Sequence, residues 1–385
     1  MTERSDKASR TVLFVFVGAH VINDFYATVL PAFLPSVAEE FDLDYTELGI
    51  LSLAFSLFTG VLQPLLGNFA DRRGMHKQVV VGGFIAGAIG FLAMASSPSF
   101  WFIVLVSLLC GLGAATYHPQ ATSFIVESYP QERGRMLGLH GLGGSAGHFL
   151  APAVTVLAVA VLDWRLTMVA IAVPLFITAT VLGNKLHTTR PNEGASLRGA
   201  ITKELMLAAV TFGVLGIVGR SFLTFMVKML VDEGWRETDA GIILTVILLV
   251  GAVAQPLGGR LYDRFGGRAV MTTSAAGMAA FVAMFAITDG ALALVALAGM
   301  EFFAFAVFPV GLALASKLGG GQTGAAAGVV FGVSGLMTAA FQPLVGALGE
   351  GLGDIREALG WLFPVALVGV LLASRLDDSS AEASR

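Results

Sequence analysis

Long apolar segments recur along the whole chain of 385 residues, and they limit its possible folds more than any other feature. Runs of about 18 or more apolar residues can each cross about 30 Å of hydrocarbon as a helix. Only 13% of the residues are charged, whereas soluble proteins carry about 25%. The sequence therefore predicts an all-α membrane protein, and it leaves no room for a sizeable soluble domain.

We expect twelve transmembrane helices, because twelve apolar segments alternate with short polar connections. Of the 23 Lys and Arg residues, 18 fall on the side of both termini, three fall on the opposite side and two lie inside the seventh segment. Since positive charge accumulates on the cytoplasmic side of membrane proteins, we expect both termini in the cytoplasm. The approximate segments are 11–37, 46–70, 77–96, 100–129, 135–162, 164–186, 201–230, 238–262, 269–288, 290–317, 323–349 and 358–376.

The chain also resembles itself at an offset near half its length. Seven of the twelve residues from Gln63 to Gly74 recur 192 positions later, between Gln255 and Gly266. Two parallel halves of six helices, with a substrate site between them near the middle of the membrane, are an architecture of secondary transporters. The predicted parts are an N-terminal half at 1–187, a cytoplasmic linker at 188–200 and a C-terminal half at 201–385.

The repeated loop motif has a physical interpretation of its own. Its glycines allow close helix approach and tight turns, while a carboxylate and cations occupy the turn on the cytoplasmic side. Such a carboxylate can pair with an arginine or a helix N-terminus in one conformation and release it in another, so that the motif acts as a conformational latch. A topology signal with solvated charges is the alternative. The latch candidates are Gly67, Asp71, Arg72, Gly74, Gly259, Asp263, Arg264 and Gly266.

With these residues the chain resembles the major facilitator superfamily, whose loop after the second helix carries a glycine, Asp-Arg-x-Gly and basic residues. Within the superfamily it is similar to the fosmidomycin resistance protein branch, which comprises proton-driven drug exporters. Two segments carry that likeness: 20–35, which begins His-Val-Ile-Asn-Asp-Phe-Tyr-Ala, and 117–121, which reads Tyr-His-Pro-Gln-Ala. The resemblance implies the major facilitator fold and a transporter in a bacterial-type inner membrane.

The fourth helix departs from the patterns of these relatives. Superfamily members commonly carry an arginine linked to proton coupling four residues before a glycine, and here Ser107 stands at that place before Gly111. Branch members often have an acid after His-Pro, and here the residue is Gln120. We therefore expect another group of the chain to carry protons.

Four ionisable side chains lie inside apolar segments, where a charge costs about 2.5–3.5 kcal/mol. One of them, Lys228, is expected to extend toward the outer surface. Asp24 is central in the first helix with His20 one turn earlier on the same face, so we expect it to bind protons; a permanently paired, structural Asp24 is the alternative. Glu301 in the tenth helix is the second candidate for proton coupling. Arg220 is either the counter-ion of one of these acids or an anchor for an anionic substrate, because guanidinium holds carboxylate or phosphonate through two parallel hydrogen bonds.

His118 and His148 join His20 as titratable candidates. The resemblance places the fourth and fifth helices beside the cavity, and imidazole titrates near neutral pH. Each histidine is alternatively a hydrogen-bonded packing residue. The branch motifs and the aromatic run after Glu301 supply the substrate-binding candidates that accompany Arg220, which are Asn23, Tyr26, Tyr117, Gln120 and Phe305.

Our primary hypothesis is proton-coupled export, by antiport, of a small drug-like or anionic compound through alternating access, with no enzymatic activity. The alternative is proton-coupled import of a small organic anion, and the remote alternative is a membrane sensor that transports nothing. The sequence holds no local metal-ligand motif and no phosphate-binding loop, so we expect no metal, no cofactor and no nucleotide-driven pumping. The expected partners of a monomeric chain are the substrate, protons and the lipid bilayer, without nucleic acid.

Overall fold

The computed structural model of the chain describes residues 2–129, 133–186, 191, 201–318 and 323–377. Within these ranges the backbone is helical apart from short connections, and it contains no strand. The predicted linker, 188–200, lies outside the described residues except for Pro191. The helices are α1 (Thr2–Thr28), α2 (Leu30–Phe41), α3 (Tyr45–Arg73), α4 (His76–Ala95), α5 (Phe100–Ala115), α6 (Tyr117–Ser128), α7 (Arg133–Leu162), α8 (Trp164–Lys185), α9 (Lys203–Asp232), α10 (Glu237–Ala286), α11 (Gly290–Leu318), α12 (Thr323–Leu352), α13 (Ile355–Gly360) and α14 (Phe363–Ala373).

Among the described residues, eleven segments are long and apolar enough to cross a membrane. One of them, α10, has 50 residues, and at about 1.5 Å per residue it is about 75 Å long, more than twice the thickness of the hydrocarbon layer. It bends at Gly266, whose φ of 80° and ψ of 166° are not helical. The two arms of α10 make two crossings, so the described chain crosses twelve times, as the sequence predicts.

Prolines explain why two of the crossings are broken in the middle. The first crossing divides into α1 and α2 around Val29, with Pro31 in the first turn of α2. The fourth crossing divides into α5 and α6 around Thr116, with Pro119 in the first turn of α6. Proline lacks a backbone N–H, so it fits the first turn of a helix better than its interior. Both breaks lie within a few residues of Asp24 or His118.

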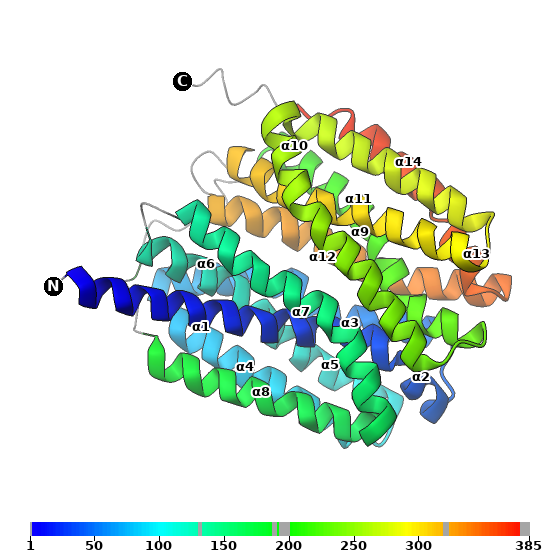
Figure 1. Cartoon of the computed structure of the whole chain (residues 1–385), viewed down its shortest axis with the longest axis horizontal. Helices are drawn as coiled ribbons and strands as arrows, with labels where there is room; N and C mark the ends of the chain where they lie inside the picture. The colour runs from blue at the N-terminus through cyan, green and yellow to red at the C-terminus, as the bar shows by residue number, and fades with distance from the viewer. Residues whose placement is uncertain (1, 130–132, 187–190, 192–200, 319–322, 378–385) are drawn as a thin grey trace.

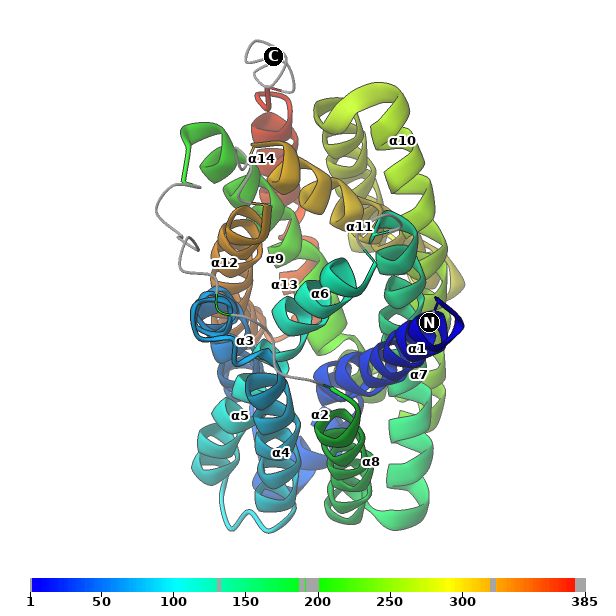
Figure 2. The same cartoon turned by 90° about the vertical axis from the view of Figure 1, so that its left-hand side faces the viewer.

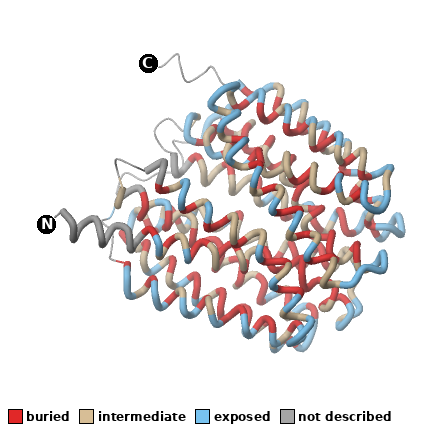
Figure 3. Tube along the Cα trace, in the orientation of Figure 1, coloured by how far each residue is buried: buried red, intermediate tan, exposed pale blue. Residues whose placement is uncertain are grey.

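The helices form one bundle in which α1 to α8 lie together and α9 to α14 lie beside them (Figures 1 and 2). The beginning of α1 and the end of α14 lie at the same end of the bundle (Figure 1). Buried residues gather between the helices, while exposed residues follow the outer faces (Figure 3). Leu166, Val173 and Ile177 on α8 are 53%, 53% and 58% exposed. Because a water-soluble protein rarely exposes such a continuous apolar face, we assign this face to the lipid.

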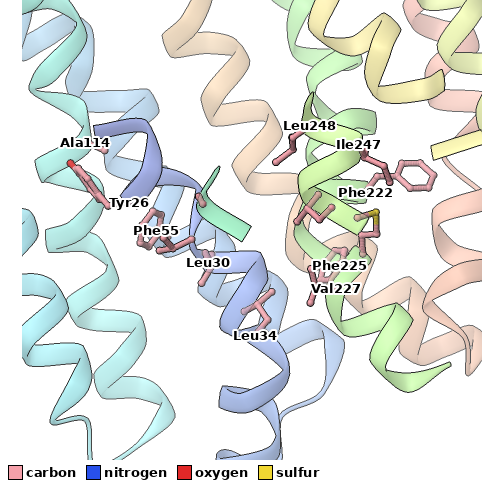
Figure 4. Packing of buried hydrophobic residues seen from close by; sticks show 14 of the residues in the cluster. Tyr26, Leu30, Leu34, Phe55, Ala114, Phe222, Phe225, Val227, Ile247 and Leu248 are labelled. Atoms are coloured by element: carbon pink, nitrogen blue, oxygen red, sulfur yellow. The ribbon is translucent and has the colours of Figure 1, made fainter. Parts of the chain in front are cut away.

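One large apolar core runs through both halves of the bundle (Figure 4). In the first half it contains Tyr26 and Phe55, and in the second half it contains Phe222 and Phe225, all no more than 2% exposed. The aromatic rings fill the space where neighbouring helices cross. This packing fixes the first half as a unit around α1, which carries Asp24.

Several hydrogen bonds join the two halves at the end of the bundle away from the termini. Ser36 on α2 donates to Glu237 at the start of α10. The Tyr45 hydroxyl donates to Asp232 over 2.6 Å, and the Tyr45 backbone N–H donates to Glu350 of α12 over 2.8 Å. These bonds join the halves at this end in the present conformation.

Close approach of α3 and α12 at the same end depends on Gly346. A Cβ added at Gly346 would collide with the Tyr45 carbonyl oxygen, whereas a Cβ at Gly351, on the same helix, would meet nothing within 4 Å. We predict that Gly346→Ala lowers the melting temperature, because overpacking costs about 1–3 kcal/mol. Gly351→Ala is the matched control and should not lower it, since alanine favours the helix. Thermal unfolding of the purified variants in detergent measures both, and equal melting temperatures would contradict this account of the contact.

Candidate functional site

The carboxylate of Asp24 lies among three imidazole rings inside the bundle. It is 3.1 Å from Nε2 of His20 on α1, 3.5 Å from Nε2 of His118 on α6 and 3.2 Å from Nδ1 of His148 on α7. Asn23 donates to Asp24 Oδ1 over 2.8 Å. The structure therefore brings together the four residues that the sequence predicted for proton coupling in the first half.

The tautomer of His20 decides what the cluster can bind. His20 Nδ1 lies 2.8 Å from the backbone oxygen of His140, and since a carbonyl oxygen can only accept, Nδ1 carries a hydrogen. In a neutral His20 ring, Nε2 then presents a lone pair to the Asp24 carboxylate at 3.1 Å. Two acceptors at that distance need a proton or another cation between them. The His140 ring stacks on the His20 ring with a centroid distance of 4.1 Å and holds its plane.

The cluster extends to a third ligand atom. Nε2 of His20, the carboxylate of Asp24 and Nε2 of His118 lie within 4.8 Å of one another, so by distance a small cation could sit among them. The sequence shows no local metal-ligand spacing at this group, because His118 comes from a different helix than His20 and Asp24. The fixed His20 tautomer requires a positive charge between its Nε2 and the Asp24 carboxylate, and a proton supplies that charge.

Gly144 on α7 makes room for this arrangement. A Cβ at Gly144 would lie 2.5 Å from His20 Nε2 and 2.6 Å from Asp24 Oδ2. One turn later, a Cβ at Gly147 would collide with the carbonyl oxygen of Val21. The glycines of the fifth crossing thus allow α7 to pack directly on α1, which small residues permit in membrane helices.

Access to Asp24 runs through two of the histidines. The side chains of His118 and His148 are each 38% exposed, whereas the Asp24 side chain is 7% exposed. The ring of His148 contacts the ring of Phe305 on α11, with centroids 6.4 Å apart at 90°. Phe305 therefore borders the cluster from the second half, in the region where the sequence predicted it to meet a substrate.

Arg220 and Glu301, the intramembrane charges of the second half, do not form an ion pair with each other or with Asp24 within 4.0 Å among the described residues. Nη2 of Arg220 lies 3.3 Å from the Ser56 hydroxyl. Glu301 is 1% exposed, and neither of its carboxylate oxygens has a hydrogen-bond partner. Of the two roles that the sequence left open for Arg220, this conformation does not show the counter-ion role.

Four of the predicted substrate-binding residues cannot contact a substrate in this conformation. Asn23, Tyr26, Tyr117 and Gln120 are 1%, 1%, 0% and 0% exposed. The Tyr117 hydroxyl donates to the Phe16 carbonyl oxygen over 2.5 Å, and Tyr26 packs against neighbouring rings of the first half. For these residues the prediction does not fit this conformation, because tertiary packing within the first half covers them.

Sequence reasoning missed His76, which joins two of the predicted groups. His76 Nδ1 lies 2.8 Å from Oε1 of Gln120, and its Nε2 lies 3.2 Å from Oδ1 of Asp71. The loop motif after α3 is thereby linked to the helix that carries His118. The position of His76 beside the motif was visible in the sequence, but its contact with Gln120, 44 residues away, was not.

The loop motif shows the expected turns but not all of the expected contacts. Gly74 and Gly266 have φ angles of 65° and 80°, which favour glycine. A Cβ at Gly67 would lie 3.0 Å from Pro119 Cβ, whereas a Cβ at Gly259 would meet nothing within 4 Å. The prediction of close helix approach at Gly259 is therefore wrong. The close approach falls one residue earlier, at Gly258, because there the helix faces the backbone of α11.

The latch role of the charged residues in the loop motif stays a prediction. Asp71 contacts His76, the first residue of α4, rather than an arginine. Arg72 lies in the last turn of α3, and Arg264 lies over the ring of Phe265 with its guanidinium carbon 5.1 Å from the ring centre. Asp263 lies within α10, just before the bend at Gly266.

We predict that Gly144→Ala disrupts the cluster while Gly138→Ala does not. Both glycines lie on α7, but a Cβ at Gly138 would meet nothing within 4 Å. The added methyl at position 144 must displace the His20 ring and the Asp24 carboxylate or push α7 away from them, and overpacking of this kind costs about 1–3 kcal/mol. Thermal unfolding and transport by the two variants in the same membranes test this. A Gly144→Ala protein with unchanged stability and transport would show that the packing of α7 on α1 does not matter.

Comparisons with known proteins agree on one family. The family model described as "Major Facilitator Superfamily" matches residues 16–216 and 205–384. The uncharacterized MFS-type transporter YfnC of Bacillus subtilis strain 168 is 28% identical, over 94% of this chain and 93% of its own length. The fosmidomycin resistance protein of Escherichia coli strain K12 is 22% identical, over 82% and 80%. The hexuronate transporter of Bacillus subtilis strain 168 is 25% identical, over 74% and 75%.

A solved structure has the same fold. The crystal structure of a bacterial homolog of the human lysosomal transporter Spinster, in an inward-facing and unoccupied conformation, gives a TM-score of 0.78. It covers 96% of this chain and 97% of its own length at 15% sequence identity. The likeness concerns the fold alone, and it agrees with twelve crossings.

Proposed function

The chain belongs to the major facilitator superfamily, and we propose that it is a proton-coupled secondary transporter that exports a small organic compound. In this proposal residues 1–187 rock against residues 201–385 around a central cavity, so that the site opens to one side of the membrane at a time. Protons enter as the compound leaves. The chain would lie in a bacterial inner membrane as a monomer, with both termini in the cytoplasm.

The contact between His20 Nε2 and Asp24 Oδ2 carries the proposal. With Nδ1 of His20 donating to the His140 carbonyl oxygen, this pair needs one proton between its facing atoms. Further groups face the same carboxylate: Asn23 from α1, His118 from α6 and His148 from α7. Because these groups come from different helices, a shift of α6 or α7 changes how strongly the proton is held. That dependence couples proton binding to conformation.

Glu301 is the second proton-sensitive group in this proposal. An ionised carboxylate at 1% exposure with both oxygens unbonded would cost several kcal/mol unless a cation came alongside. A proton removes that charge.

The names of the relatives point to different kinds of compound. The resistance named for the Escherichia coli relative supports export of a drug-like compound. The hexuronate transporter is named for a small organic anion, which is the class of compound in the second candidate, import with protons. The unneutralised Arg220 guanidinium favours an anionic compound in either direction. Rocking of the same two halves would serve both.

We predict that Asp24→Asn removes transport without removing the protein. Asparagine keeps the size of the side chain but can hold no transferable proton, so transport falls about tenfold or more, equivalent to about 1.4 kcal/mol or more in activation free energy. The measurement is the fosmidomycin and amphipathic-drug susceptibility of a sensitive bacterial host that produces the protein, with membrane quantities checked by immunoblot.

Asp42→Asn is the matched control for this experiment. Asp42 follows the last residue of α2 and does not belong to the cluster. Its φ is 53°, a conformation that asparagine tolerates. The control should confer the same resistance as the wild type. Equal resistance from Asp24→Asn would remove the coupling role of Asp24, and no resistance from the wild type despite good membrane quantities would favour import.

A further inference from the structure

Arg220 carries a positive charge inside the bundle that no acid of the described chain neutralises. No carboxylate oxygen of the described residues lies within 4.0 Å of its guanidinium. The neighbouring residues of α9, Gly219 and Ser221, are buried, whereas Arg220 is partly exposed. Glu301 remains beyond ion-pair distance of Arg220 and is itself buried. The arginine therefore has an open side and an unmet need for an anion.

The one polar contact of Arg220 that the structure shows crosses between the halves. Nη2 of Arg220 on α9 lies 3.3 Å from the hydroxyl of Ser56 on α3. This distance is longer than an ordinary N–H···O bond, and a guanidinium has five N–H donors. Most of those donors, together with the hydroxyl hydrogen of Ser56, are available to a ligand that enters between the halves.

The surroundings of Arg220 suit the rest of a small organic molecule. A Cβ at Gly219, the residue before Arg220, would lie 3.3 Å from the Cβ of Ala304, the residue before Phe305, and the ring of Phe305 contacts the ring of His148. The cationic group and the aromatic ring thus border one region from α9 and α11. A compound with an anionic group at one end and an apolar or hydroxylated body could contact both.

We infer that Arg220 and Ser56 form an oxyanion site, shared by the two halves, for the carboxylate, sulfonate or phosphonate group of a small organic substrate. The planar guanidinium binds two oxygens of such a group through parallel N–H donors, and the Ser56 hydroxyl donates to a third position. The inference rests on the proposed transport function and adds the chemical class of the substrate. Because the site takes one group from each half, an oxyanion bound there draws the halves together.

Thermal unfolding of the purified, full-length protein in detergent tests the site without transport. The probes are phosphonoacetate, sulfoacetate and galacturonate at millimolar concentration, with galactose, choline chloride and sodium chloride at equal ionic strength as controls. We expect at least one oxyanion to raise the melting temperature by about 2 °C or more, and the controls to leave it unchanged.

Substitutions at Arg220 and Ser56 test whether the shift in melting temperature comes from binding at the oxyanion site. Arg220→Gln should abolish the shift, and Arg220→Lys should reduce it, because an ammonium group keeps the charge but lacks the planar fork. Ser56→Ala should weaken binding several-fold. Lys228→Gln is the matched control and should keep the full shift, since Lys228 is a cation on the same helix that is already paired with Asp232.

The outcomes separate this inference from the proposed function. If no oxyanion shifts the melting temperature, or if a folded Arg220→Gln protein keeps the shift, the oxyanion site is wrong, even where Asp24→Asn abolishes drug resistance. If Arg220→Gln does not fold, an unchanged shift in both Arg220→Lys and Ser56→Ala overturns the site in the same way. If oxyanions bind through Arg220 while Asp24→Asn transports normally, the site stands and the proton-coupling role of Asp24 fails.

Discussion

A carboxylate inside the hydrocarbon layer needs a positive partner, and in this chain imidazole rings surround the carboxylate of Asp24. Removing an unpaired carboxylate from water costs several kcal/mol. The partners come from α1, α6 and α7, so these three helices must lie close together for Asp24 to be buried at all. The helix break near His118 and the glycine at position 144 both serve that contact. The close packing of α7 on α1 lies at this one group.

In the second half, in contrast, the side chains of Arg220 and Glu301 lack partners at ion-pair distance among the described residues. Arg220 is a cation without an acid at ion-pair distance in the described chain, and Glu301 is a buried carboxyl group without a hydrogen-bond partner. The two halves therefore offer different ligands to the space between them, a place for a proton on one side and a place for an anion on the other. Contacts such as Tyr45 with Asp232 join the halves at one end in this conformation. A transporter that works by alternating access needs contacts of this kind that can open.

The sequence predicts the fold well, because membrane crossings depend on local properties. Segment length, hydropathy and the repeat predicted twelve crossings, and even the bend at Gly266 lies at the repeated glycine. His20 and Asp24 could be paired from their spacing of four residues on one helix. The convergence of His118 and His148 on Asp24 could not be deduced from spacing, since it depends on how three helices pack. The same cause hid His76 and placed Tyr26 and Tyr117 in the packed interior. At Gly259, the repeat predicted a contact that the helix makes one residue earlier.

The protonation of His20 tests the central claim most directly. Nitrogen-15 solid-state NMR of histidine-labelled protein in lipid bilayers distinguishes the two ring nitrogens, and loss of one signal set in His20→Gln assigns this residue among the six histidines. The account predicts a hydrogen on Nδ1 of His20, donated to the His140 carbonyl oxygen, and a second hydrogen between Nε2 and the Asp24 carboxylate. A neutral His20 with its hydrogen on Nε2 and none on Nδ1 would contradict the account. In that tautomer Nε2 donates to the Asp24 carboxylate, so no further proton is needed between the two groups.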